Sequence, residues 1–209
     1  MNERIIETDA CVIEGMKWLA ARCPRMKAAY AQTGPLPLRR KPDGFDPLLN
    51  AIIGQQVSIA SANAIWGRMV GAGMVTADAC AAASEDELRG LGLSRQKALY
   101  AGELARAGID FDGLRDLPSD AVIKTLTAVK GIGPWTAEIY VMFSLGRADV
   151  FAPGDLALQE AAKVLYDLPE RPTEKAFRVM AEDWAPWRSV AARLLWAYYR
   201  VEKNREGIS

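Results

Sequence analysis

Helical patterning is the feature that most constrains how this chain of 209 residues can fold. Apolar residues recur at helical spacing over most of its length, and no convincing series of alternating strands is found. Serine, threonine and aspartate residues, together with glycine and proline, divide the pattern into about nine or ten helices of ordinary length. The sequence therefore predicts an all-α fold, large enough for one domain or two helical lobes.

Composition shifts near the N-terminus suggest a boundary. A first helix is expected over Thr8–Cys23, and Pro24 is expected to end it. Residues 34–46 contain three prolines and two glycines, which predicts an extended loop. We therefore expect residues 1–45 to form an N-terminal helix and a proline-rich loop that pack on a helical body, residues 46–209.

Within this body, capping residues locate the helices. One long apolar helix is expected from Pro47 to about Val70, with Asp46 as its N-cap. Ser84 and Glu87 have the spacing of a capping box, and Ser94 is expected to cap the next helix.

The absence of histidine limits the chemistry of the chain. It excludes Ser-His-Asp and Cys-His catalysis and histidine-ligated zinc. The three cysteines, Cys11, Cys23 and Cys80, are widely spaced and cannot supply the four ligands of a cysteine-only iron–sulfur cluster. General acid–base chemistry would then fall to carboxylates, lysine, tyrosine or cysteine.

Net charge and targeting signals limit the binding partners and the cellular location that the sequence predicts. The 26 basic and 26 acidic residues balance, so nucleic-acid binding would have to rest on local patches. The first ten residues do not form a secretory signal, and no apolar run is long enough to span a membrane. We expect a cytoplasmic protein of bacterial type, associated with the nucleoid, or a nuclear one in a eukaryote.

A glycine-containing turn joins two helical patterns in LTAVKGIGPWTAEI, residues 126–139. Gly131 and Gly133 allow positive φ angles and a close backbone approach, and Pro134 suits the first turn of a helix. The N–H groups of that helix N-terminus could bind a phosphodiester, beside the charge of Lys130. A helical hairpin used only for packing would show the same glycines.

Downstream, the segment DVFAPGD ends in Asp155, which precedes another helical pattern. An aspartate after a Pro-Gly turn is usually an N-cap. The residue can also serve as a carboxylate for catalysis, and the two roles are compatible.

Five strings together resemble the helix-hairpin-helix DNA glycosylase superfamily and are most similar to its alkylation-repair branch, 3-methyladenine DNA glycosylase II. They are FDPLLNAIIGQQVS, LSRQKALY, LTAVKGIGPWTAEI, DVFAPGD and WAPWRSVAARLLW. The similarity covers about residues 45–200. It implies a two-lobed helical fold with the hairpin at residues 120–145 and an active site in the cleft between the lobes.

The resemblance assigns roles to individual residues. Asp155 matches the catalytic aspartate. The DNA backbone would be bound by hairpin residues, namely Lys130, Gly131, Ile132, Gly133, Trp135 and Thr136. Backbone carbonyls of Thr127, Val129 and Ile132 would hold a monovalent cation, Na⁺ or K⁺. No cofactor is required for the reaction.

Base flipping requires a wedge and a pocket. Gln56 matches the residue that inserts into the duplex, although a glutamine on a solvated helix face would look the same. Trp135 and Trp196 match pocket tryptophans, and Phe45 and Trp66 are weaker candidates. Aromatic residues at helical spacing are more often part of the core.

Departures from the family pattern refine the expected reaction. Trp135 stands where bifunctional glycosylase-lyases carry a nucleophilic lysine, which implies a monofunctional enzyme. Ile139 and Leu156 stand where well-known relatives carry tyrosine, so the pocket would be less polar.

The expected activity is hydrolysis of the N-glycosidic bond of alkylated purines, 3-methyladenine or 7-methylguanine, in double-stranded DNA by a monomer. Two alternatives stay open. One is a non-catalytic DNA-binding protein with the same hairpin, and the other is a glycosylase for a deaminated or oxidised base.

Overall fold

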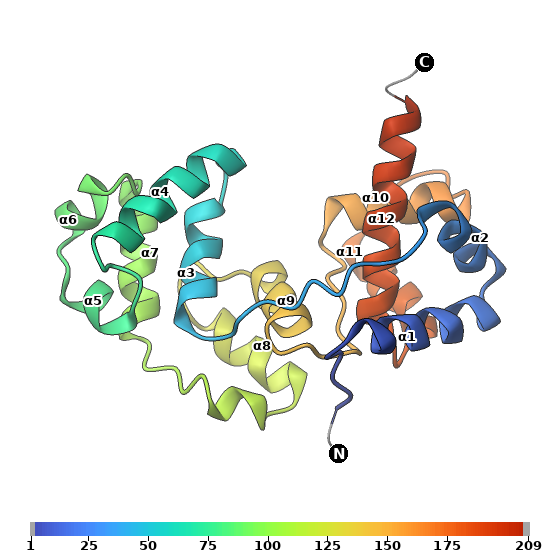
Figure 1. Ribbon diagram of the computed structural model, residues 1–209, viewed down its shortest axis with the longest axis horizontal. Coiled ribbons are helices and arrows are strands. Elements are labelled where there is room, and N and C mark those ends of the chain that lie inside the picture. Colours follow the sequence, from blue (N-terminus) through green and yellow to red (C-terminus); the bar gives the residue numbers. More distant parts are fainter. Residues whose placement is uncertain (1–2, 207–209) are drawn as a thin grey trace. The chain divides into compact units, whose positions relative to one another are not determined.

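The computed structural model describes residues 3–206 and divides the chain into two compact units (Figure 1). The central unit is Lys41–Tyr140, and the terminal unit combines Met1–Arg40 with Val141–Ser209. Across the described residues there are twelve α-helices, two short 3₁₀-helices and no β-strand, which confirms the predicted all-α class. No helix among residues 3–206 is both long and apolar enough to cross a bilayer.

The terminal unit is built around a long C-terminal helix. Its helices are α1 (Asp9–Arg22), α2 (Pro24–Thr33), α10 (Leu156–Tyr166), α11 (Glu174–Met180) and α12 (Arg188–Glu206). Helix α12 contacts α1, α2 and α10. Phe151, Phe177 and Trp184 form an edge-to-face aromatic cluster in the core, with ring centroids 4.9 to 5.9 Å apart. The N-terminal segment therefore belongs to the unit that also holds Asp155.

The first helix ends as predicted, and a second helix that the sequence did not predict lies between it and the proline-rich loop. Helix α1 stops at Arg22, and Pro24 opens α2. Proline is favoured at the first position of a helix because its missing N–H has no intrahelical partner there. The ten residues of α2 were not predicted, since Pro24 was interpreted only as a stop signal.

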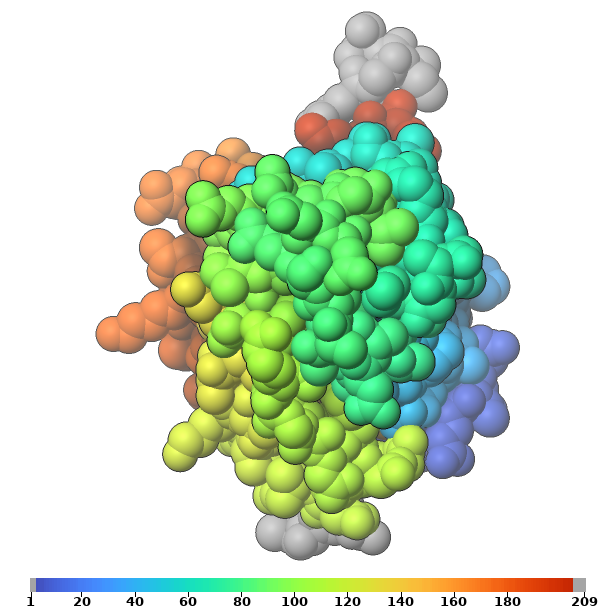
Figure 2. Space-filling model, turned by 90° about the vertical axis from the view of Figure 1, so that its left-hand side faces the viewer, coloured from blue at the N-terminus to red at the C-terminus, as the bar shows by residue number. Residues whose placement is uncertain are grey.

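The central unit packs its helices around α7. The helices are α3 (Phe45–Gly54), α4 (Ile59–Gly71), α5 (Ala77–Ala82), α6 (Glu85–Gly90), α7 (Arg95–Arg106) and α8 (Ser119–Thr127). Helix α7 contacts α3, α5 and α6. Figure 2 shows one face of the molecule, on which the segments of the central unit are coloured from cyan to green. Helix α9 (Pro134–Phe143) begins here and crosses the unit boundary after Tyr140.

The prediction of one long helix from residue 47 to residue 70 is wrong, because the helix is interrupted between α3 and α4. Gln56 adopts a positive φ of 55°, which no helix residue can adopt. Ser58 then caps α4 by accepting a hydrogen bond from the Ser61 N–H. The break converts Gln56 from a helix-face residue to the tip of a short loop.

The predicted capping box of α6 is confirmed. Ser84 Oγ accepts from the Glu87 N–H, and the Glu87 carboxylate accepts from the Ser84 N–H. The hydrogen bonds that the Ser84 N–H and hydroxyl donate to the carboxylate lower the pKa of Glu87. Ser94 caps α7 by accepting from the Lys97 N–H, also as predicted.

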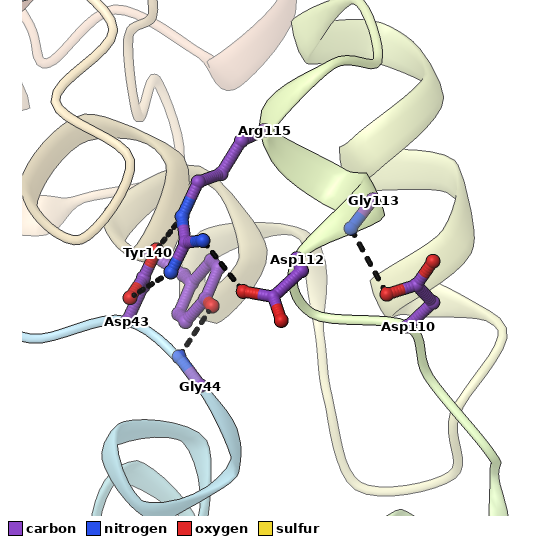
Figure 3. A network of polar contacts seen from close by, with 7 residues as sticks. All are labelled: Asp43, Gly44, Asp110, Asp112, Gly113, Arg115 and Tyr140. Carbon is purple, nitrogen blue, oxygen red and sulfur yellow. Dashed lines mark hydrogen bonds and ion pairs between the residues drawn. The ribbon is translucent and has the colours of Figure 1, made fainter.

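The start of α3 is fixed by a polar network (Figure 3). Gly44, not Asp46, occupies the N-cap, with a φ of 115°, and its N–H donates to the Tyr140 hydroxyl at 2.8 Å. Arg115 binds both carboxylate oxygens of Asp43 at 2.7 and 2.9 Å. Asp46 lies in the first turn, where the helix dipole favours a negative charge. Burial raises the pKa of Tyr140 to about 12.

Candidate nucleic-acid interface and catalytic carboxylate

The predicted hairpin is present between α8 and α9. Helix α8 ends at Thr127, and the Ile132 N–H donates to the Val129 carbonyl within the turn. Gly131 has a φ of 99°, and an added Cβ would lie 2.4 Å from a ring atom of Tyr100. Both constraints select glycine at this position.

The second glycine does not use the positive φ that glycine allows. Gly133 does not lie in the left-handed region, and an added Cβ would have no heavy atom within 4 Å. Its carbonyl accepts the Ala137 N–H at the start of α9. The turn geometry therefore requires glycine only at Gly131. Gly133 has no side chain that would cover the surface before α9.

Hairpin residues divide into an exposed set and a buried set. Lys130, Gly133, Pro134 and Trp135 are exposed, with Trp135 46% accessible, whereas Ile132 and Thr136 are buried. The buried pair anchors the turn. The exposed set surrounds the N-terminus of α9, where backbone N–H groups lack intrahelical acceptors and favour an anion.

The loop between α3 and α4 is joined to the hairpin. Gln55 Nε2 donates to the Gly131 carbonyl at 3.0 Å, so the loop tip is held beside the turn. A groove of about 580 Å³ lies along this junction, and Gln56, Gln96 and Tyr100 line it with the two glycines of the turn. Three of the five strings found in the sequence thus meet on one surface of the central unit.

Two residues of this surface carry roles that the sequence did not indicate. Gln55 provides the hydrogen bond, while only its neighbour Gln56 had been considered. Lys97 is buried and donates from Nζ to the Ile53 carbonyl at 2.7 Å. Burial lowers the pKa of Lys97. Its function is to hold the C-terminal end of α3.

Asp155 lies at the N-terminus of α10 in the terminal unit and is half-buried. Its Oδ1 accepts the Leu158 N–H at 3.0 Å, which makes it the N-cap. The same oxygen also accepts the indole N–H of Trp196 at 3.3 Å. The N-cap interpretation is therefore correct, and the cap is in addition tied to a tryptophan of α12.

The segment that carries Asp155 is anchored on both sides. Arg188 binds the Asp149 carboxylate through two hydrogen bonds of 2.7 and 2.8 Å. Ser189 Oγ contacts the Arg147 and Val150 carbonyls at 2.6 and 2.8 Å. Gln159 Nε2 donates to the Pro153 carbonyl at 2.7 Å. The Arg188 guanidinium is thus held in an ion pair within the terminal unit.

The aromatic candidates have different environments. Phe45 is buried at 8% accessibility in the core of the central unit, and Trp66 is half-buried on α4. Trp135 is exposed, and Trp196 is half-buried with its ring 5.7 Å from that of Phe143. Their stacking on a base stays a prediction. The two positions lacking the expected tyrosine also differ, since Ile139 is half-buried and Leu156 is 63% exposed.

The three carbonyls predicted to hold a monovalent cation lie at the end of α8 and in the turn. The Val129 carbonyl accepts one hydrogen bond and so retains a second lone pair. Thr127 Oγ1 is directed back to the Ile123 and Lys124 carbonyls. No cluster of three or more acidic or cysteine side chains suited to a metal occurs among residues 3–206. Carbonyl oxygens suit hard cations such as Na⁺ or K⁺, and binding of one stays a prediction.

Known proteins are similar to this chain in sequence and in architecture. The family described as the HhH-GPD superfamily base excision DNA repair protein matches residues 49–186. The chain is 27% identical over 184 residues to the putative DNA-3-methyladenine glycosylase YfjP of Bacillus subtilis, covering 82% of this chain and 64% of that protein. It thus spans slightly less than two thirds of that relative.

Solved structures match more completely. The DNA-3-methyladenine glycosidase of Bacillus halodurans is 32% identical, with a TM-score of 0.81 over 98% of this chain and 95% of that one. The 3-methyladenine DNA glycosylase Mag1 of Schizosaccharomyces pombe, solved in complex with abasic DNA, is 29% identical, with a TM-score of 0.74 over 88% and 95%. The match over residues 49–186 includes the loop between α3 and α4, the hairpin and the Asp155 turn, and the chain belongs to the HhH-GPD superfamily of base excision DNA repair proteins.

Proposed function

We propose that this protein is a monofunctional DNA glycosylase that removes alkylated purines, 3-methyladenine or 7-methylguanine, from double-stranded DNA. The observation that carries the proposal is the Asp155 carboxylate, held at the start of α10 by the Leu158 and Trp196 N–H groups. Similar proteins that are named 3-methyladenine DNA glycosylases or glycosidases support alkylated purines as the substrate class. DNA as the partner is supported by the abasic-DNA complex of Mag1.

The chemistry requires one well-placed negative charge. An N3- or N7-alkylated purine carries a formal positive charge, so the electron pair of the N-glycosidic bond neutralises the base as it leaves. Positive charge then develops on the sugar, and the Asp155 carboxylate stabilises this oxocarbenium-like state. Water adds to C1′ and loses a proton to the carboxylate or to solvent, which leaves an abasic site. No step requires histidine, and the chain has none.

In this proposal the central unit binds the DNA. A phosphate meets the N-terminus of α9 beside Lys130, and contact with the backbone allows scanning without regard to sequence. Gln56, exposed at the tip of its loop, enters the duplex where the base has left. Trp196 of the terminal unit contacts the cationic base through its ring face.

The principal experiment measures bases released from methylated duplex DNA by the wild-type protein and by Asp155→Asn. Asparagine can accept the same two hydrogen bonds through its Oδ1 and caps helices as well as aspartate. The substitution therefore removes the negative charge, replaces the second carboxylate oxygen with an NH₂ group and keeps the cap. We expect the excision rate to fall by about 100-fold or more, with binding to abasic DNA nearly unchanged. Asp9→Asn, an exposed first-turn aspartate of α1 in the same unit, is the matched control.

The alternatives give different results in the same assay. Excision that survives Asp155→Asn would refute the catalytic assignment. DNA binding without release of any base by the wild-type protein would identify a non-catalytic binder, and release from deaminated or oxidised DNA alone would change the substrate class. A covalent DNA adduct after borohydride treatment would contradict the monofunctional assignment, which rests on Trp135 replacing a lysine.

A further inference from the structure

Two hydrogen-bond donors converge on one oxygen of Asp155. The Leu158 N–H comes from the first turn of α10, and the Trp196 indole N–H comes from α12, at 3.0 and 3.3 Å from Oδ1. An ordinary N-cap needs only the first of these. The indole bond is therefore additional to what helix capping requires.

The indole itself is supported from within the same unit. Its ring packs on Phe143 at 5.7 Å with an interplanar angle of 36°, and the Arg193 guanidinium lies 4.7 Å from the Phe143 centroid on α9. Arg193 is 1% exposed and donates to the Leu38 and Ser189 carbonyls. A packed series of side chains, from Arg193 through Phe143 and Trp196, thus ends at the carboxylate.

We propose that Trp196 is a positioning residue, whose indole N–H fixes the orientation of the Asp155 carboxylate toward the sugar on which positive charge develops. This inference rests on the proposed function of Asp155. It gives Trp196 a role different from contact with the base, which the ring face would provide.

The physical reason is preorganisation. A carboxylate stabilises a cation at a fixed place best when it keeps one orientation, and each added donor restrains its rotation about the Cβ–Cγ bond. Two neutral donors on Oδ1 restrain this rotation without removing the negative charge. The indole bond thus contributes to the transition state and not to the binding of the intact substrate.

Abasic ligands separate this role from base contact, because they contain no base. One probe is duplex DNA with a cationic pyrrolidine at the abasic position, which imitates the charged sugar, and the other carries the neutral tetrahydrofuran analogue. We expect the wild-type protein to bind the pyrrolidine duplex more tightly and Asp155→Asn to lose this preference. Trp196→Phe keeps a ring but removes the N–H, so it should reduce both the preference and the single-turnover excision rate by about ten-fold.

A double-mutant comparison tests the coupling. Trp196→Phe should have no further effect on the preference when Asp155→Asn is already present. Trp18→Phe, a half-buried tryptophan of α1 in the same unit, is the matched control and should leave the preference unchanged. If Trp196→Phe does not fold, Phe143→Leu removes the ring that supports the indole. A reduced preference in that variant supports the inference, and an unchanged one overturns it.

The outcomes distinguish the positioning role from the proposed function. A preference that Asp155→Asn abolishes and Trp196→Phe leaves intact would overturn the positioning role alone. A wild-type protein that shows no preference and releases no base would contradict the proposed function itself.

Discussion

Helices α9 and α10 both begin after a short turn that contains glycine, yet the chain treats their N-termini differently. At α10 the chain supplies its own anion, because the Asp155 carboxylate accepts the Leu158 N–H. At α9 the first residue is Pro134, and Gly133, Pro134 and Trp135 are all exposed. The N-terminus of any helix favours a negative charge.

This difference shows how one physical property can serve two purposes. At α10 the helix N-terminus fixes a carboxylate that belongs to the proposed chemistry. At α9 it faces solvent, where our proposal places a phosphate of the DNA. The two turns should therefore respond differently to mutation: changes at the hairpin should alter DNA binding, and changes at Asp155 should alter the chemical step.

The largest effect on stability is expected at the hairpin glycine. Gly131→Ala places a Cβ 2.4 Å from the Tyr100 ring and forces alanine to a φ of 99°. We expect a loss of about 3 kcal/mol or more in the free energy of unfolding, from backbone strain and overpacking together. Urea titration followed by tryptophan fluorescence and circular dichroism measures the loss.

Gly133→Ala is the matched control for this prediction. It has no left-handed φ to maintain and no heavy atom within 4 Å of the new methyl group. We expect its stability to stay within about 0.5 kcal/mol of the wild type, while its affinity for abasic DNA falls because the methyl group covers the exposed amides. Equal destabilisation by the two substitutions would contradict the assignment of the turn geometry to Gly131.

A smaller effect is expected at the other helix N-terminus. Asp155→Ala removes the cap of α10 and leaves the Trp196 N–H without this acceptor, so it should cost about 1 to 2 kcal/mol of stability. Asp155→Asn keeps a hydrogen-bond acceptor and should lower the free energy of unfolding by a few tenths of a kcal/mol at most. Thermal melting of both variants measures the difference. Similar melting temperatures would mean that the cap contributes little to the stability of the unit.

Local signals in the sequence predicted the parts of the fold that depend on neighbouring residues. The capping box of Ser84 and Glu87, the cap at Ser94 and the glycine turn at Gly131 are all formed. Each consists of hydrogen bonds or backbone angles within a few residues, and so each has a recognisable pattern.

Features that depend on distant residues were not predictable in this way. The apolar run before Val70 hides a break, because Gln56 is held outside the helix region while Gln55 bonds to the Gly131 carbonyl, 76 positions away. The same limit applies to the candidate site. Asp155 was predicted to be an N-cap from its turn and a catalytic residue from the family resemblance, but its bond to Trp196, 41 positions away, is visible only in the structure.

The strained loop gives a prediction of smaller size. Gln56 has a φ of 55°, a conformation that costs a residue with a side chain more than it costs glycine. Gln56→Gly should therefore stabilise the free protein by about 0.5 to 1 kcal/mol, while it weakens binding to DNA with a flipped base. Gln56→Asn retains an amide and tolerates this φ, so it separates strain from side-chain length. A Gln56→Gly protein that is both less stable and fully active would contradict a strained wedge.

The smallest expected effect concerns the charge beside the α9 N-terminus. Lys130 is exposed next to the hairpin, and the chain has no net charge that would attract DNA from a distance. Lys130→Gln should therefore reduce the slope of log K against log salt concentration for duplex DNA by about 0.9, the value for one phosphate contact. Lys17→Gln, an exposed lysine of α1 in the terminal unit, removes the same charge and should leave the slope unchanged. Fluorescence anisotropy at several salt concentrations measures both slopes. A similar decrease in the two variants would indicate that overall charge determines the affinity. The contrast between the exposed first residues of α9 and the Asp155 cap of α10 would then have no consequence for binding.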